Sequence, residues 1–194
     1  GDIDSTAAAY AAAFLDPAAT PAPCDAVTLS PFLGGDSIAP FLEACARHAA
    51  GIFVLVRTSN PGGADFQHHG EPALSLVIAD AVDAWGAELV GDCGLSSVGA
   101  VVGATQPSEL RALRARMPRT PFLLPGYGAQ GAGPQDVVGA FLRPGARGAL
   151  VNSSRAIAFA YQNPRYAGRH WKDAARASLD EMVAALGAAL AGRA

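Results

Sequence analysis

Two kinds of apolar pattern alternate along the chain. Short, nearly continuous apolar runs such as residues 52–56 are typical of strands buried on both faces, and longer stretches with interspersed polar positions are typical of helices. The predicted strands are 26–29, 51–57, 99–104, 121–124 and 148–151. The predicted helices are 5–15, 38–50, 73–85, 107–117, 134–142 and 171–191. Because strands that alternate with helices pair in parallel through helical crossovers, the sequence predicts an α/β fold.

The last two predicted strands end in loops that carry glycine and polar side chains. Residues 125–131 follow one strand and contain three glycines and Gln130, and residues 152–155 follow the next strand and end in Arg155. Glycine lets a backbone pass close to a ligand, and a guanidinium offers a fixed, bidentate charge. Two successive strand-end loops that share one phosphate are typical of the last two βα units of a (β/α)8 barrel. The pattern therefore indicates a phosphate monoester held by Gln130 and Arg155.

The number of strands bounds the fold class. Five strands are predicted in 194 residues, whereas a complete (β/α)8 barrel has eight strands and usually about 250 residues. We therefore expect a (β/α)8 TIM barrel of which about the first three βα units are missing from this chain. The start at Gly1, without an initiator methionine, agrees with this expectation. Residues 1–194 are expected to form a single barrel domain, its C-terminal two thirds, because the Pro- and Gly-rich segments are typical of strand-end loops.

Composition and charge exclude several classes of protein. With 51% hydrophobic and 16% charged residues the chain is typical of a globular domain, and its net charge of −3 gives no cationic field for nucleic acid. No apolar run approaches the roughly 18 to 20 residues of a membrane span. The three cysteines, an odd number without metal-like spacing, are expected to be buried, reduced thiols in a cytoplasmic protein. His68 and His69 are adjacent and lack a third partner, so no metal site is expected.

Four segments of the chain carry motifs that occur in a defined order. They are Asp2-Ile3-Asp4-Ser5-Thr6, Arg57-Thr58-Ser59-Asn60-Pro61-Gly62, Pro125-Gly126-Tyr127-Gly128-Ala129-Gln130-Gly131 and Asn152-Ser153-Ser154-Arg155. Together they resemble the orotidine 5′-phosphate decarboxylase family, especially its bacterial branch with the Arg-Thr-Ser-Asn-Pro-Gly strand end. In that family they correspond to the tail of an Asp-x-Lys-x-x-Asp-Ile-x-x-Thr motif, the pyrimidine loop, the phosphate-gripper loop and the terminal phosphate site. The resemblance extends from Asp2 to about Arg176.

The resemblance implies an activity and a catalytic residue. The family converts orotidine 5′-phosphate to uridine 5′-phosphate and CO2 in de novo pyrimidine biosynthesis, as a homodimer and without a cofactor. By this resemblance Asp2 is catalytic and reaches into the active site of the neighbouring subunit. Ile3 and Thr6 would accompany it beside the ribose and the pyrimidine.

The resemblance also implies substrate-binding residues at the strand ends. Ser59 would hydrogen-bond the pyrimidine ring, and Pro125 would help to wall it. Gln130 and Arg155 would hold the 5′-phosphate, with Ser154 in the same terminal phosphate site. Phosphate binding would then contribute to rate by closing loops over the ring.

The chain also departs from the family pattern, which leaves other interpretations open. The resemblance assigns the proton-donating lysine and its partner aspartate to positions just before Gly1, and a further aspartate and lysine to the first two strands, so this sequence contains none of them. One alternative is a related phosphate-binding barrel lyase that acts on a sugar phosphate, and another is an inactive fragment that only binds nucleotide. Simpler roles are a helix cap for Asp2, a turn for Ser59 and a surface ion pair for Arg155.

Overall fold

The described part of the chain forms one parallel sheet. In the computed structural model, which describes residues 2–103, 107–128, 131–142 and 146–192, five strands lie side by side in the order of the sequence. They are β1 (Ala26–Leu29), β2 (Gly51–Arg57), β3 (Val98–Val102), β4 (Phe122–Leu124) and β5 (Ala149–Val151). All neighbouring pairs are parallel. The prediction of an α/β fold is confirmed, and the last three predicted strands differ from the observed ones only at their ends.

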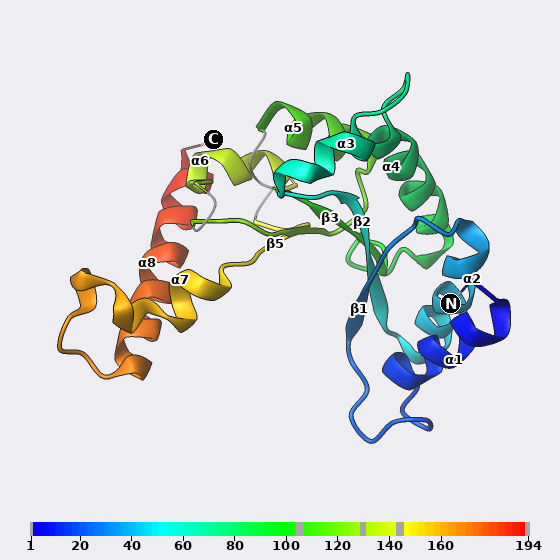
Figure 1. Ribbon diagram of the computed structural model, residues 1–194, viewed down its shortest axis with the longest axis horizontal. Helices are drawn as coiled ribbons and strands as arrows, with labels where there is room; N and C mark the ends of the chain where they lie inside the picture. The colour runs from blue at the N-terminus through cyan, green and yellow to red at the C-terminus, as the bar shows by residue number, and fades with distance from the viewer. Residues whose placement is uncertain (1, 104–106, 129–130, 143–145, 193–194) are drawn as a thin grey trace.

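The helices are arranged as in consecutive units of a barrel. When neighbouring parallel strands follow one another in sequence, right-handed crossovers place all the connecting helices on one face of the sheet. A doubly wound sheet differs, because it has helices on both faces. The helices are α1 (Asp4–Leu15), α2 (Gly35–His48), α3 (Ala64–Gln67), α4 (Leu74–Trp85), α5 (Pro107–Arg116), α6 (Pro134–Val137), α7 (Ser154–Ala158) and α8 (Trp171–Ala191). Short 3-10 helices are η1 (Pro61–Gly63), η2 (Ala87–Leu89), η3 (Val138–Ala140), η4 (Ala160–Gln162) and η5 (Pro164–Tyr166). In Figure 1, α1 and α2 lie together on one side of β1, and α8 lies beside α6 and α7. None of the helices in the described ranges is long and apolar enough to cross a membrane.

Short helices account for the main differences from the predicted elements. The apolar pattern does not predict α3 or α7, because helices of four and five residues are too short to show a periodicity. The predicted helix 134–142 is wrong in its second half, where α6 gives way to η3. Gly139 has a low helix propensity, and a Cβ added to it would lie 3.0 Å from Cγ of Arg111 on α5. Close packing on α5 therefore shapes this segment.

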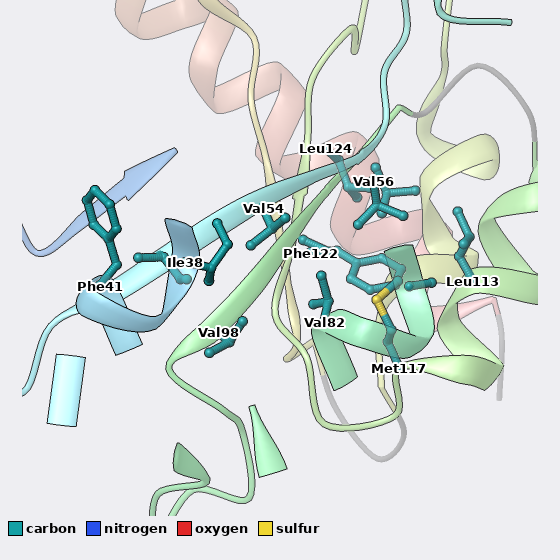
Figure 2. Packing of buried hydrophobic residues seen from close by; sticks show 14 of the residues in the cluster. Ile38, Phe41, Val54, Val56, Val82, Val98, Leu113, Met117, Phe122 and Leu124 are labelled. Carbon is teal, nitrogen blue, oxygen red and sulfur yellow. The ribbon is translucent and has the colours of Figure 1, made fainter. Parts of the chain in front are cut away.

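The main core lies between the sheet and the helices. Figure 2 shows Val54 and Val56 of β2 among Val82, Phe122 and Leu124, all of them buried. Along β2 buried residues alternate with half-buried ones, so the helices cover one face and the other is only partly covered. The expectation of strands buried on both faces is therefore confirmed for β3, which is buried throughout, and is wrong for β2.

A buried arginine joins α5 to the starts of β4 and β5. Arg114 is buried and donates hydrogen bonds to four backbone carbonyls. The distances are 2.8 Å to each of the carbonyl oxygens of Met117, Thr120, Ala140 and Gly148. The guanidinium carbon also lies 3.6 Å from the centroid of the Phe122 ring. Burial lowers the pKa of Arg114 to about 10, so the side chain remains charged at neutral pH and the carbonyl dipoles and the ring face stabilise that charge.

The cysteines differ in their surroundings. Cys45 is buried, and burial raises the pKa of its thiol to about 11. Cys24 and Cys93 are exposed, so the expectation of buried cysteines is wrong for these two. Both lie in connections between elements rather than in a strand or helix that packs against the core. All three cysteines are free thiols.

The Arg114 contacts predict different effects for two arginines on one helix. Because Arg114→Met removes four hydrogen bonds to buried carbonyls, it is expected to lower the free energy of unfolding by about 3 kcal/mol. Arg116→Met is the matched control; it loses an exposed ion pair with Asp80 and is expected to lower the same quantity by about 0.5 kcal/mol. Urea denaturation measures both values. Equal losses would contradict the structural role of Arg114.

Candidate functional site

The carboxyl ends of β4 and β5 lie next to each other. The N–H of Asn152 donates to the carbonyl of Leu124 at 3.0 Å, and Oγ of Ser153 donates to the carbonyl of Tyr127 at 3.3 Å. Burial raises the pKa of Tyr127, which keeps its phenol neutral beside these loops. The structure thus brings together the two strand ends at which the sequence predicts phosphate ligands.

Glycines determine the path of the loop that follows β4. Gly126, Gly128 and Gly131 have φ angles of 94°, 75° and 89°, in the region that L side chains rarely adopt. The N–H of Gly128 donates to the carbonyl of Ala132 at 2.9 Å, and the N–H of Gly131 donates to the carbonyl of Gly128 at 3.1 Å, so the loop closes on itself. Gln130, the predicted phosphate ligand of this loop, lies outside the described residues.

A cavity of about 600 Å³ opens where this loop meets α7 and η4. Its lining residues are Gly128, Arg155, Ala156, Phe159, Gln162, Asn163 and Pro164. Arg155 is exposed and forms no ion pair with any residue that the structure describes, so the surface ion pair considered for it is not found there. An unpaired guanidinium beside a glycine backbone can bind an anion of the size of a phosphate group.

Five cavity residues were not expected from the sequence: Ala156, Phe159, Gln162, Asn163 and Pro164. Phe159, Gln162 and Asn163 line the cavity because α7 and η4 pack against each other after β5. The Asn-Pro pair at 163–164 is a local turn signal, and Oδ1 of Asn163 accepts a hydrogen bond from the N–H of Arg165 at 3.0 Å to begin η5. No periodicity marks Phe159 or Gln162, so only the tertiary structure identifies them.

The two other residues expected beside the phosphate loops lie at the ends of the same strands. Pro125 is half-buried and directly follows β4. Ser154 begins α7 and is exposed, and its Oγ donates to Oδ1 of Asn152 at 3.3 Å. Pro125 precedes Gly128 by a few residues, and Ser154 directly precedes Arg155. Both are therefore close in sequence to residues that line the cavity.

Ser59 lies beyond the end of β2 and packs against the end of β3. A Cβ added to Gly103 would lie 3.0 Å from both Cα and N of Ser59, so only glycine at position 103 permits this approach. Leu55 pairs with Val101 and Arg57 with Val102, which leaves one extra residue in β2 and bends the strand before Ser59. Ser59 is half-buried and lies in a bend before η1, and its hydroxyl has no hydrogen-bond partner among the described residues.

Arg57 and Thr58 of the predicted pyrimidine loop have structural roles. Nε of Arg57 lies 2.8 Å from Oε2 of Glu109, whose Oε1 lies 3.2 Å from Nε2 of His68. Thr58 hydrogen-bonds the side chain of Gln67 on α3. Neither Gln67 nor Glu109 was assigned from the sequence, because their partners come from a different element. No group of three or more His, Cys, Asp or Glu residues within the described ranges could hold a metal ion.

Asp2, Ile3 and Thr6 lie at the opposite end of the strand order from Arg155. They lie at the start of α1, which packs against α2 and β1, whereas Arg155 follows β5 at the other end of the strand order (Figure 1). Asp2 is exposed and makes no capping hydrogen bond to α1, so the helix-cap role is not observed. Ile3 is 62% exposed. No hydrogen bond or ion pair between these side chains and Ser59 or Arg155 is found among the described residues.

The consecutive parallel strands with their connecting helices define the class of βα-barrel proteins. A family model described as "Orotidine 5'-phosphate decarboxylase / HUMPS family" matches residues 1–170. The orotidine 5′-phosphate decarboxylase of Rhodopirellula baltica is 45% identical over 190 residues, which cover 93% of this chain and 63% of that protein. That of Deinococcus radiodurans is 46% identical over 188 residues, which cover 96% of this chain and 65% of that protein.

A solved structure supports the same assignment. The crystal structure of a putative orotidine 5′-phosphate decarboxylase from Streptomyces avermitilis has 37% sequence identity and a TM-score of 0.77, and the match covers 98% of this chain and 63% of that one. The chain therefore belongs to the orotidine 5′-phosphate decarboxylase / HUMPS family. This confirms the resemblance seen in the sequence and identifies the five-stranded sheet as part of a (β/α)8 barrel. The chain spans less than two thirds of the length of these relatives.

The close approach of β3 to Ser59 predicts opposite effects for two glycine substitutions. Gly103→Ala introduces a methyl group 3.0 Å from the Ser59 backbone and is expected to lower the free energy of unfolding by about 1 to 2 kcal/mol. Gly187→Ala in α8 is the control, because a Cβ there meets nothing within 4 Å, and it is expected to stabilise the protein by about 0.5 kcal/mol. Thermal and urea denaturation measure the sign of each change. A neutral Gly103→Ala would show that Ser59 does not depend on this contact.

Proposed function

We propose that this chain is the C-terminal two thirds of an orotidine 5′-phosphate decarboxylase, which converts orotidine 5′-phosphate to uridine 5′-phosphate and CO2 in de novo pyrimidine biosynthesis without a cofactor. In this proposal residues 1–194 belong to a single barrel domain whose first three βα units precede Gly1. The observation that carries the proposal is the unpaired Arg155 in the cavity beside Gly128, at the two strand ends expected to share a phosphate. The relatives named above favour this activity over a lyase acting on a sugar phosphate.

The strand-end residues bind the two ends of the nucleotide in this proposal. Arg155 and Gln130 hold the 5′-phosphate with Ser154 beside them, since a guanidinium and a neutral amide complement its charge and its oxygens. Ser59 hydrogen-bonds the pyrimidine, because its hydroxyl has no partner among the described residues. Pro125, which directly follows β4, packs against the pyrimidine ring in this proposal. Phosphate and base are thus recognised from different strands of one sheet edge.

The chemical step needs groups beyond the strand ends. Loss of CO2 from C6 of the pyrimidine leaves a carbanion that no cofactor delocalises, so a cation and a proton donor must be preorganised beside a carboxylate. Asp2 supplies a carboxylate only. Because the family's motif lysine would precede Gly1, we expect the chain as given to bind nucleotide without decarboxylating it.

The proposal includes a homodimer, which the resemblance of Asp2, Ile3 and Thr6 to the family motif implies. These three residues lie at the start of α1, beside β1, whereas Arg155 follows β5 at the other end of the strand order. In the proposed dimer each copy supplies Asp2 to the site of its partner. The small-molecule substrate, the net charge of −3 and three free thiols support a cytoplasmic enzyme that does not bind nucleic acid.

Calorimetric titration with uridine 5′-phosphate and with uridine tests this function. It uses two proteins: the chain as given, and the same chain preceded by the part of the Rhodopirellula baltica decarboxylase that it does not match. We expect both to bind the nucleotide more tightly than the nucleoside, and the fused protein also to decarboxylate orotidine 5′-phosphate. If neither folded protein prefers the phosphorylated compound, the proposed function is wrong. If both bind but the fused protein is inactive, the chain is a nucleotide-binding remnant.

The phosphate role of Arg155 predicts a selective loss of affinity. Arg155→Ala is expected to raise the dissociation constant of uridine 5′-phosphate about 30-fold and to leave that of uridine unchanged, because one charge-assisted contact to the phosphate is lost. In the fused enzyme the Michaelis constant should rise and kcat should fall, since phosphate binding helps to close the site. Arg176→Ala, which loses only an exposed ion pair with Asp180, is the control. Equal weakening of both ligands would remove Arg155 from the phosphate site.

A further inference from the structure

The side chain of Gln67 holds the residue before Ser59 through two hydrogen bonds. Oε1 of Gln67 accepts from the N–H of Thr58 at 2.9 Å, and Nε2 donates to Oγ1 of Thr58 at 2.8 Å. Gln67 is the last residue of α3, and Thr58 is the first residue after β2. One side chain amide therefore fixes both the backbone and the side chain of Thr58.

Arg57 completes the hydrogen bonds of this strand end. Its Nη1 donates to the carbonyl of Thr58 at 2.7 Å and to Oε1 of Gln67 at 3.2 Å, and its Nε is paired with Glu109 at 2.8 Å. The Arg57 side chain is only 11% exposed. The N–H, the carbonyl and the hydroxyl of Thr58 thus all have partners inside one partly buried network.

The hydrogen-bonded pair of Thr58 and Gln67 packs closely against Gly63. A Cβ added to the buried Gly63 would lie 2.6 Å from Oγ1 of Thr58 and 3.0 Å from Oε1 of Gln67, so the hydrogen-bonded pair fills the space beside η1. Gly103 approaches the backbone of Ser59 closely, since a Cβ added there would lie 3.0 Å from its N and Cα. Two glycines, Gly63 and Gly103, therefore pack against the segment 58–59.

From this geometry we infer that Gln67 is a positioning residue that orients Ser59 toward the pyrimidine and so determines the preference for a base-bearing ligand. The inference rests on the proposed function. A hydrogen bond from a serine to a ring depends on direction, and a serine held in one direction before the ligand binds loses less conformational entropy. Gln67 suits this role because a neutral amide accepts and donates at once, without adding charge beside Arg57 and Glu109.

Two ligands separate positioning of the base from general stability. Gln67→Leu in both proteins defined above is expected to raise the dissociation constant of uridine 5′-phosphate about tenfold, because two hydrogen bonds that fix Thr58 are lost. The dissociation constant of ribose 5-phosphate, which has no base, should change less than about twofold. Gln135→Leu is the control, since Gln135 is exposed on α6 and makes no hydrogen bond among the described residues.

Two further variants keep the test independent of folding. Gln67→Glu preserves the acceptor for the N–H of Thr58 but not the donor to its hydroxyl, and Thr58→Val removes only that hydroxyl, so each should weaken uridine 5′-phosphate binding by less than Gln67→Leu does. The inference is overturned if Gln67→Leu weakens the binding of uridine 5′-phosphate and ribose 5-phosphate equally, or leaves both unchanged, in a protein whose unsubstituted form binds the nucleotide. Failure of the unsubstituted protein to prefer the nucleotide overturns the proposed function itself.

Discussion

The buried guanidinium of Arg114 fixes the part of the sheet from which the phosphate loops extend. The carbonyl of Gly148 accepts hydrogen bonds from Nη2 of Arg114 at 2.8 Å and from the N–H of Phe122 at 2.9 Å, so one oxygen joins α5, β4 and the start of β5. A shift of β4 against β5 would strip a buried charge of its partners, which is costly in a low-dielectric interior. Because both strands are short, their ends at Leu124 and Val151 then lie in register, and the following loops meet.

The two halves of the proposed site are shaped by different means. The loop after β4 relies on glycines with positive φ, which bring backbone groups close to a ligand and leave space beside Arg155. The segment after β2 relies on the side chains of Arg57 and Gln67, which hold Thr58 in one conformation. The glycine-rich loop suits the phosphate of a nucleotide, because a phosphate accepts hydrogen bonds from many directions. The segment held by side chains suits the pyrimidine, because the edge of the ring forms hydrogen bonds in few directions.

The sheet also carries features that agree with a larger barrel. Phe53 and Leu55 of β2 are half-buried on the face away from the helices, and Leu150 of β5 is 57% exposed. A closed barrel fills its interior with side chains from alternate strand positions, so further βα units would cover such residues in the proposed complete protein.

The sequence alone determined the parallel α/β fold, the family and the strand ends that carry Ser59 and Arg155. These depend on local signals, because continuous apolar runs mark buried strands and glycine, proline and arginine follow them at short spacing. Only the tertiary structure identified Gln67, whose hydrogen-bond partner Thr58 directly follows β2, and the part of the cavity lining contributed by η4. It also assigned Arg57 to a structural network. Such roles depend on side-chain contacts between different elements, which no local pattern of apolar and polar positions encodes.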